Sequence, residues 1–206
     1  MFQAPEVQWL GIAPELALTA TALVLLLADA FAKERLPGVV IPLIASAGLI
    51  AAGYFALEGW QAAASDGAEL QLAGMIAVDG FAAFTKISLA VFGLLSVWLA
   101  REYLVHEDLE EAEYYGLVVF AVAGMMLMAS AADLIVMFLA LETFSIALYV
   151  LVGFRRFSLA GQESAMKYFL LGSFSSAFFL LGIAFVYGAT GSTLLYSAGG
   201  ADGITG

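Results

Sequence analysis

Glu142 is the residue whose position most clearly indicates chemistry. It interrupts an apolar run, Leu-Ala-Leu-Glu-Thr-Phe-Ser, about eight residues from one end of that run and about twelve from the other. A side chain so deep in a membrane helix cannot reach water, and an isolated carboxylate there binds a proton unless a cation lies nearby. Glu142 is therefore predicted to take up and release protons. The alternative is a permanently neutral Glu142 that only hydrogen-bonds to a neighbouring helix.

Two lysines and a second glutamate are further candidates for proton transfer. Lys86 lies about eight residues into an apolar run, which is deep for a lysine that extends toward water, so functional and structural roles are both open for it. Lys167 stands near the start of the last apolar run. Glu163, four residues earlier, shares its helical face in the favourable order. Lysines at helix ends usually extend to the interface, so this pair alone also fits a structural role.

Two other polar residues are expected to be structural. Asp79 precedes the third apolar run, where a carboxylate caps a helix N-terminus and complements its dipole. His106, the only histidine, lies in an acidic connection and is expected to be solvated. With no cysteine and one histidine, the sequence offers no disulfide, thiol chemistry or metal-ligand cluster. No metal site is therefore predicted.

Six apolar runs must position these side chains. They cover residues 10–31, 37–57, 78–100, 114–130, 134–154 and 165–187. Each is roughly 17–23 residues long, the length at which a helix spans about 30 Å of hydrocarbon. The alternating ten-residue segments of a membrane β-barrel do not occur. The sequence thus predicts an all-α fold, a polytopic bundle of about six transmembrane helices that forms a single domain over residues 1–206.

The composition also points to a membrane. Of the 206 residues, 63% are hydrophobic and 12% charged, and the mean hydropathy is +0.99. Soluble domains typically carry about 25% charged and about 45–50% apolar residues. The formal net charge of −11 argues against nucleic acid as a partner, because phosphate neutralisation needs clustered lysine and arginine. Membrane lipid is the expected surrounding.

The basic residues predict the orientation. Five of them follow the first, third or fifth run: Lys33, Arg35, Arg101, Arg155 and Arg156. The amino terminus, the 58–77 connection, the fourth-to-fifth turn and the tail have none. Because cytoplasmic loops are enriched in lysine and arginine, the amino terminus is predicted to lie on the non-cytoplasmic side.

Two connections have distinct expected roles. Asp133 alone separates the fourth and fifth runs, which predicts a tight helical hairpin. The acidic residues between 107 and 113 are expected to form a solvated cytoplasmic loop, with a docking surface for a partner subunit as the alternative.

Four segments in the second half of the chain carry a family resemblance. They are Glu-Tyr-Tyr-Gly-Leu-Val-Val-Phe (113–120), Gly-Met-Met-Leu-Met-Ala-Ser-Ala-Ala-Asp-Leu (124–134), Leu-Glu-Thr-Phe-Ser-Ile-Ala-Leu-Tyr-Val-Leu-Val-Gly-Phe-Arg-Arg (141–156) and Glu-Ser-Ala-Met-Lys-Tyr-Phe-Leu-Leu-Gly-Ser-Phe-Ser-Ser-Ala-Phe (163–178). They resemble subunit N of bacterial NADH–quinone oxidoreductase, respiratory complex I. The first three runs agree more loosely.

The resemblance implies an antiporter-like, proton-translocating subunit of the membrane arm, in the bacterial inner (plasma) membrane. Glu142 matches the family's glutamate on the fifth helix, which pairs with a lysine on a later helix. Lys167 and Glu163 match positions on the sixth. The implied partners are other membrane-arm subunits and protons. No cofactor or redox chemistry is expected on this chain, because NADH, flavin, iron–sulfur clusters and quinone would be bound by other subunits.

The chain also departs from the family. Family members continue through further helices and a second, inverted repeat, whereas this chain stops after its sixth run. We therefore expect part of a longer subunit, or one whose missing part is on another chain, which does not translocate protons alone. Two other functions remain open. One is an Mrp-type sodium/proton antiporter subunit, and the other is a passive spacer between neighbouring subunits.

Overall fold

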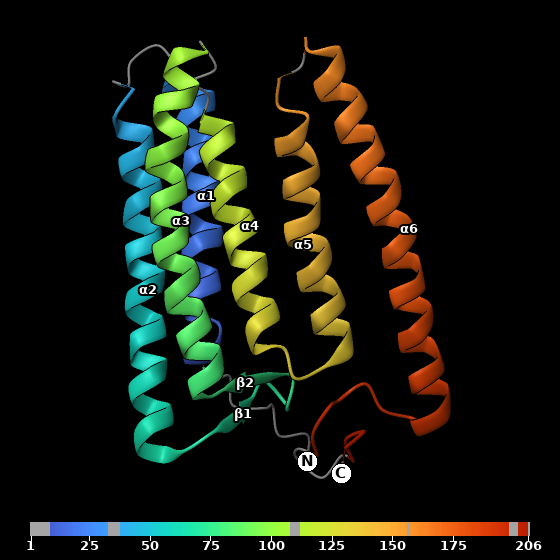
Figure 1. Ribbon diagram of the computed structural model, residues 1–206. Coiled ribbons are helices and arrows are strands. Elements are labelled where there is room, and N and C mark those ends of the chain that lie inside the picture. The colour runs from blue at the N-terminus through green and yellow to red at the C-terminus, as the bar shows by residue number, and fades with distance from the viewer. Residues whose placement is uncertain (1–8, 33–37, 108–111, 156, 198–201, 206) are drawn as a thin grey trace.

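The computed structural model describes residues 9–32, 38–107, 112–155, 157–197 and 202–205. Within them lie six α-helices, a short 3-10 helix and one β-hairpin (Figure 1). These are η1 (Trp9–Gly11), α1 (Ala13–Ala32), α2 (Val40–Asp66), β1 (Glu69–Gln71), β2 (Ile76–Val78), α3 (Gly80–His106), α4 (Ala112–Ser130), α5 (Leu134–Val152) and α6 (Leu159–Thr190). The predicted all-α fold is confirmed.

The length of each helix bears on membrane crossing. Among the described residues, α2 to α6 are five helices long and apolar enough to cross a membrane, and α1 offers a shorter apolar stretch, Ala13–Ala28. Of the basic residues that predicted the orientation, Arg101 and Arg155 lie at the end of the bundle where α1 finishes and α2 begins. Lys33, Arg35 and Arg156 lie outside the described residues.

Three helices extend further than the hydropathy indicated. α2 continues to Asp66 and α3 continues to His106, so parts of both predicted long connections are helical. α6 begins at Leu159, which places Lys167 two turns inside the helix rather than at its start. The reason is that hydropathy marks where apolar residues stop, whereas backbone hydrogen bonds extend a helix through the polar residues beyond. His106 is exposed, as expected, although it ends a helix rather than lying in a loop.

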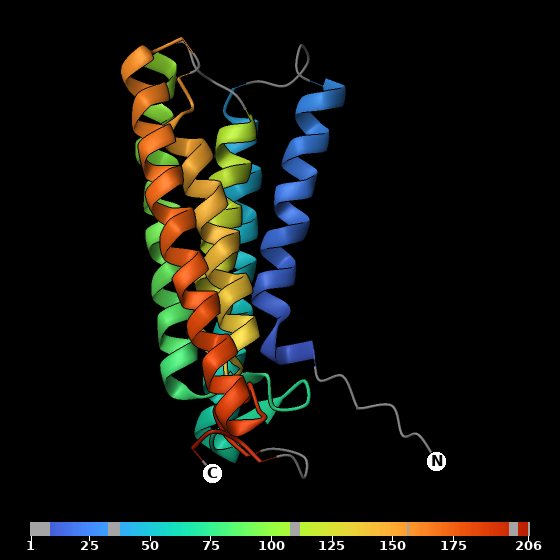
Figure 2. The ribbon, with the colours of Figure 1, turned by 90° about the vertical axis from the view of Figure 1, so that its right-hand side faces the viewer.

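Helices α1 to α4 pack around one apolar core. Its fully buried side chains come from all four helices and include Leu18, Leu49, Val97, Val119 and Met126. α5 packs along α4, and α6 packs along the side of α5 away from this bundle (Figures 1 and 2). Large apolar side chains cover the outside of α6, which is the surface expected for a helix that faces lipid or further helices.

Three non-helical segments gather at one end of the bundle, which we call the hairpin end. It consists of the β1–β2 hairpin, the α4–α5 turn at residues 131–133, and residues 193–195. The amide of Ala132 donates to the Met75 carbonyl at 2.8 Å, and the amide of Leu195 donates to the Ala132 carbonyl at 2.9 Å. Backbone groups outside helices are thus paired with one another, as a membrane protein requires near hydrocarbon. The hairpin lies in the 58–77 stretch, for which the sequence predicts only a connection between two helices.

Two aspartates begin helices, and for Asp79 this is the role expected from the sequence. The Asp79 carboxylate accepts a hydrogen bond from the Ala82 amide at 2.7 Å and caps α3. Asp133 caps α5 by accepting from the amide of Ile135 at 2.8 Å, and its other oxygen accepts from the Thr193 hydroxyl at 2.5 Å. The tight α4–α5 hairpin is therefore confirmed, and Asp133 also ties residues 193–195 to it.

The close contact between α4 and α5 depends on Gly124. A Cβ atom there would lie 2.7 Å from the backbone nitrogen of Phe144 and 3.1 Å from the carbonyl oxygen of Ala140. Small residues of this kind allow two helix backbones to approach closely in a membrane. Gly182, in the middle of α6, has nothing within 4 Å of the same position.

These two glycines form a matched pair for a stability measurement. Gly124→Ala is expected to lower the free energy of unfolding in detergent by about 1–3 kcal/mol, because the methyl group pushes α5 away from α4. Gly182→Ala is expected to be neutral or to stabilise by up to about 1 kcal/mol through helix propensity. Equal effects of the two substitutions would contradict the proposed packing role of Gly124.

Candidate functional site

Glu142 lies halfway along α5, as the ninth of its 19 residues. The side chain is partly buried, and its Oε1 atom is fully buried without a hydrogen-bond partner among the described residues. Burying a carboxylate oxygen without a donor is costly, and the cost is removed by a proton or by a cation close by. Glu142 therefore lies at the predicted depth, and its buried oxygen has no hydrogen-bond partner among the described residues.

Glu163 and Lys167 form an ion pair on α6, as their spacing indicated. The Lys167 Nζ lies 2.5 Å from Oε1 of Glu163, but the two side chains are 66% and 69% exposed. An exposed pair of this type contributes about 0–1 kcal/mol in water. Because both side chains are largely exposed, the pair lies on an outer face of α6 and not in the core of the described helices.

Ring contacts show that Lys167 and Glu142 are at different levels of the α5–α6 contact. Phe138 of α5 packs against Phe179 of α6, and Tyr149 packs against Tyr168. Glu142 lies between the two α5 rings, so its level on α6 falls between Phe179 and Tyr168. Lys167 lies beyond Tyr168, toward the start of α6.

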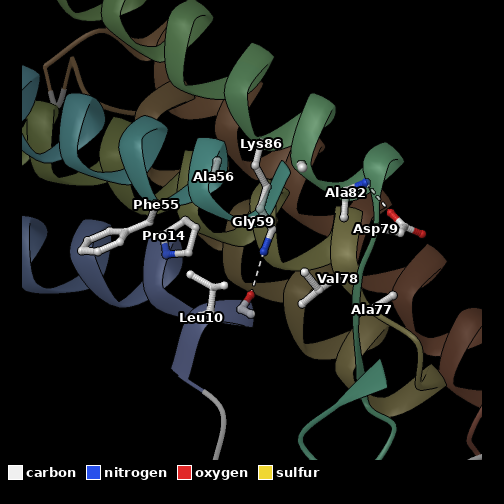
Figure 3. Close-up of a pocket in the computed structure, with 12 residues that line it drawn as sticks. Leu10, Pro14, Phe55, Ala56, Gly59, Ala77, Val78, Asp79, Ala82 and Lys86 are labelled. Carbon is white, nitrogen blue, oxygen red and sulfur yellow. Dashed lines mark hydrogen bonds between the residues drawn. The ribbon is translucent and has the colours of Figure 1, made fainter. Parts of the chain in front are cut away.

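Lys86 forms a buried ion pair with Glu15, a residue that the sequence analysis did not single out. The Lys86 Nζ lies 2.7 Å from Oε1 of Glu15 and donates a hydrogen bond to the Gly11 carbonyl at 2.9 Å (Figure 3). The side chains of Lys86 and Glu15 are only 6% and 10% exposed. Among the described residues, neither Lys86 nor Lys167 pairs with Glu142. The four predicted residues thus lie in three separate places.

The fold explains how Glu15 reaches Lys86. α1 and α3 both begin at the hairpin end and run in the same direction, with Glu15 in the first turn of α1 and Lys86 in the second turn of α3. Opposite charges at the start of two parallel helices were visible in the sequence, and they are the signal that could have identified this pair.

The hairpin fixes the start of α1. Gln71 of β1 is buried, and its Oε1 accepts a hydrogen bond from the Gly11 amide at 3.0 Å. Gly11 has room for no side chain there, because a Cβ atom would lie 2.6 Å from that same oxygen. The other end of the Gln71 amide donates to the Glu69 carboxylate at 3.3 Å. A chain of polar contacts therefore links Glu69, Gln71, Gly11, Lys86 and Glu15.

The described residues contain no cluster of three or more histidine, cysteine, aspartate or glutamate side chains placed to hold a metal ion.

A double-mutant cycle should reveal the coupling of the buried pair. Lys86→Met leaves the Glu15 carboxylate buried without its cation, so we expect the free energy of unfolding to fall by about 3 kcal/mol. Adding Glu15→Leu removes the stranded charge and should recover a large part of that loss. Chemical denaturation of the four proteins in detergent measures these free energies, and simple additivity of the two single substitutions would show that the ion pair is not coupled.

Comparison with known protein families places the candidate residues in context. The family described as "NADH:quinone oxidoreductase/Mrp antiporter, TM" matches residues 131–199, a region that includes Glu142, Glu163 and Lys167. Over nearly the whole chain, the sequence is similar to proteins named NADH-quinone oxidoreductase subunit N. The protein from Chloroflexus aggregans is 40% identical over 199 residues, and the protein from Trichlorobacter lovleyi is 39% identical over 182.

Coverage of these relatives is partial. The alignments include 95% and 88% of this chain but only 39% and 36% of the two relatives. A chain in the solved structure of respiratory complex I from Thermus thermophilus with bound aureothin has the same fold, with a TM-score of 0.72 and 33% identity. That match covers 89% of this chain and 38% of the other. The chain is therefore similar to subunit N of NADH-quinone oxidoreductase and, over residues 131–199, to an antiporter-like membrane family, and it spans about two fifths of the length of the relatives it matches.

Proposed function

We propose that this chain forms part of a proton-translocating membrane subunit of an NADH–quinone oxidoreductase and that Glu142 binds and releases the proton. The unpartnered, buried Oε1 atom at the midpoint of α5 carries this proposal. The supporting comparison is that relatives at about 40% identity are named as subunits of this enzyme.

The electrostatics of Glu142 supply the coupling in this proposal. A cation brought next to the carboxylate favours its charged form and expels the proton, and withdrawal of that cation draws a proton back. Moving one proton against about 150 mV requires roughly 3.5 kcal/mol. At about 1.36 kcal/mol for each tenfold change, this corresponds to a change in proton affinity of roughly 400-fold. One charge moving into or out of contact with a buried carboxylate is sufficient for such a change.

The moving cation in this proposal is a lysine outside the described residues, because the two lysines described in the helices, Lys86 and Lys167, are already paired. Glu163 and Lys167 would serve as an exchangeable pair on the outer face of α6, where helices of the remaining part of the subunit or of neighbouring membrane-arm subunits would cover them. Lys86 would act at a different depth, near the hairpin end. The redox cofactors NADH, flavin, iron–sulfur clusters and quinone would be held by other subunits.

A sodium/proton antiporter subunit of the Mrp type is the second candidate. The family description that matches residues 131–199 names both classes. Transport measurements separate them, because the antiporter would move protons in exchange for sodium without NADH oxidation. A passive spacer, the third possibility, would require no ionisable group at position 142.

Glu142→Gln tests the main proposal. The amide has the size of the acid but cannot carry the proton, so proton translocation driven by NADH oxidation is expected to fall about tenfold or more in vesicles that contain the assembled complex. Glu102→Gln, the same substitution at an exposed position of α3, serves as the matched control and should leave pumping unchanged. Unimpaired pumping by Glu142→Gln in a fully assembled complex would favour the spacer.

Orientation is tested by cysteine labelling, for which the chain provides a background without native cysteine. Ala68→Cys marks the hairpin end, and Phe157→Cys marks the opposite end; both positions are exposed. A bacterial inner membrane with the amino terminus outside the cytoplasm predicts that an impermeant thiol reagent labels Ala68→Cys in intact spheroplasts. Phe157→Cys should be labelled only after the membrane is opened. The reverse pattern would invert the proposed topology.

A further inference from the structure

Two cavities lie close together near the Glu15–Lys86 ion pair and share the lining residues Leu10 and Val78. We call the cavity that Lys86 lines the inner cavity and the other one the outer cavity. The outer cavity has a volume of about 280 Å³, and the residues that line it include Trp9, Ala63, Gly67, Glu69 and Gln71. A water molecule needs about 10–15 Å³ measured in the same way, so this cavity has room for many waters. Glu69 is exposed at its wall, and Gln71 is buried.

The inner cavity adjoins the ion pair. It has a volume of about 20 Å³, which is room for one water molecule, and Gly11, Asp79, Ala83 and Lys86 are among the residues that line it (Figure 3). Leu10 and Val78 line both cavities, so the two are separated only by the thickness of these side chains. The Gln71–Gly11 hydrogen bond lies at the same place and joins the polar groups on either side.

The ion pair itself is incompletely satisfied. Neither oxygen of Glu15 accepts a hydrogen bond of good geometry from the described residues, although Oε1 is in ionic contact with Lys86. The Oε2 atom is buried and has no contact of either kind. A buried carboxylate oxygen that lacks a donor is a position at which a proton or a water molecule is stabilised.

We propose that the Glu15–Lys86 pair is a second proton-exchange site, which protons reach from the aqueous phase at the hairpin end through the outer cavity and past Gln71. The step is a simple transfer. A proton leaves a hydronium ion in the outer cavity, moves along water molecules past the Gln71 side chain, and forms an O–H bond with Oε2 of Glu15, while Lys86 stays an ammonium and a water molecule is left behind. Release is the same step reversed, so no other bond changes and no co-reactant is needed.

Few charged groups are found among the described residues that form the ion pair or line the two cavities. Besides Glu15 on α1 and Lys86 on α3, they are Glu69 on β1, at the wall of the outer cavity, and Asp79 at the start of α3, at the wall of the inner cavity. Both are acidic and favour the arrival of a positive charge from the hairpin end. This inference rests on the proposed function because it assigns Lys86 to a proton path. It does not depend on the role proposed for Glu142.

The first test asks whether water reaches Gln71. Gln71 and Ile76 are partners across the hairpin and are similarly buried, at 6% and 2%, but only Gln71 is among the residues that line the outer cavity. In the full chain in lipid vesicles opened with detergent, Gln71→Cys should react with a positively charged thiosulfonate reagent about tenfold or more faster than Ile76→Cys. Equal slow rates would overturn the hydrated route.

The second test observes the proton on Glu15 itself. In Lys86→Met the carboxyl group loses its cation and should become protonated, which adds a carboxylic-acid C=O band to the infrared spectrum. Subtraction of the spectrum of Lys86→Met/Glu15→Gln isolates the band of Glu15. Transfer to D₂O should shift it within the mixing time, and replacement of Gln71 by Leu in the same background should slow that shift measurably.

The outcomes separate this inference from the proposed function. A band that fails to appear, or that keeps its position in D₂O for hours, would overturn a water-accessible exchange site at Glu15. If Lys86→Met does not fold, the same D₂O shift is sought in the native chain at acid pH, as the difference from Glu15→Gln, and its absence overturns the proposal equally. Glu142→Gln should leave both the cysteine rates and the Glu15 band unchanged, so failure of pumping at Glu142 and failure here are read independently.

Discussion

The absence of water at membrane depth is the constraint on which this structure depends. A polar group in hydrocarbon must find its partner within the protein, and leaving it without one costs several kcal/mol. Helices satisfy most backbone groups, and the non-helical segments pair with each other at the hairpin end. Against this background two glutamates with buried carboxylate oxygens stand out. Glu15 has a cation, and Glu142 has no partner among the described residues. The two carboxyl groups therefore lie in different electrostatic surroundings.

The hairpin end positions the starts of helices as well as closing the loops between them. Gln71 holds the Gly11 amide, and Gly11 in turn presents its carbonyl to Lys86, so a strand of three residues positions the start of α1 against α3. The α4–α5 turn binds the same hairpin, and residues 193–195 bind that turn. The ends of α1, α4, α5 and α6 are thereby connected through short hydrogen-bonded segments.

Hydropathy predicted the helical bundle and the depth of Glu142, because both follow from the length of apolar runs. The caps at Asp79 and Asp133 were also predictable, since an aspartate before an apolar run has a local role. The Glu15–Lys86 contact depends instead on how two helices align in three dimensions, and that alignment is fixed by Gln71 in strands too short to show a periodic pattern. The exposure of Lys167 was likewise hidden, because sequence spacing shows which residues share a face but not what covers that face. The proton path itself stays a prediction.

The buried ion pair has a consequence for the way the chain enters a membrane. α1 is synthesised before α3, and an unpaired lysine in the second turn of α3 raises the cost of entering the bilayer, by at most the roughly 2.5–3.5 kcal/mol of a charge at a helix centre. Glu15 offsets that cost only if α1 has stayed close to the site of insertion until Lys86 arrives. For this offset to operate, α1 must already be in the membrane and close to α3 when α3 inserts.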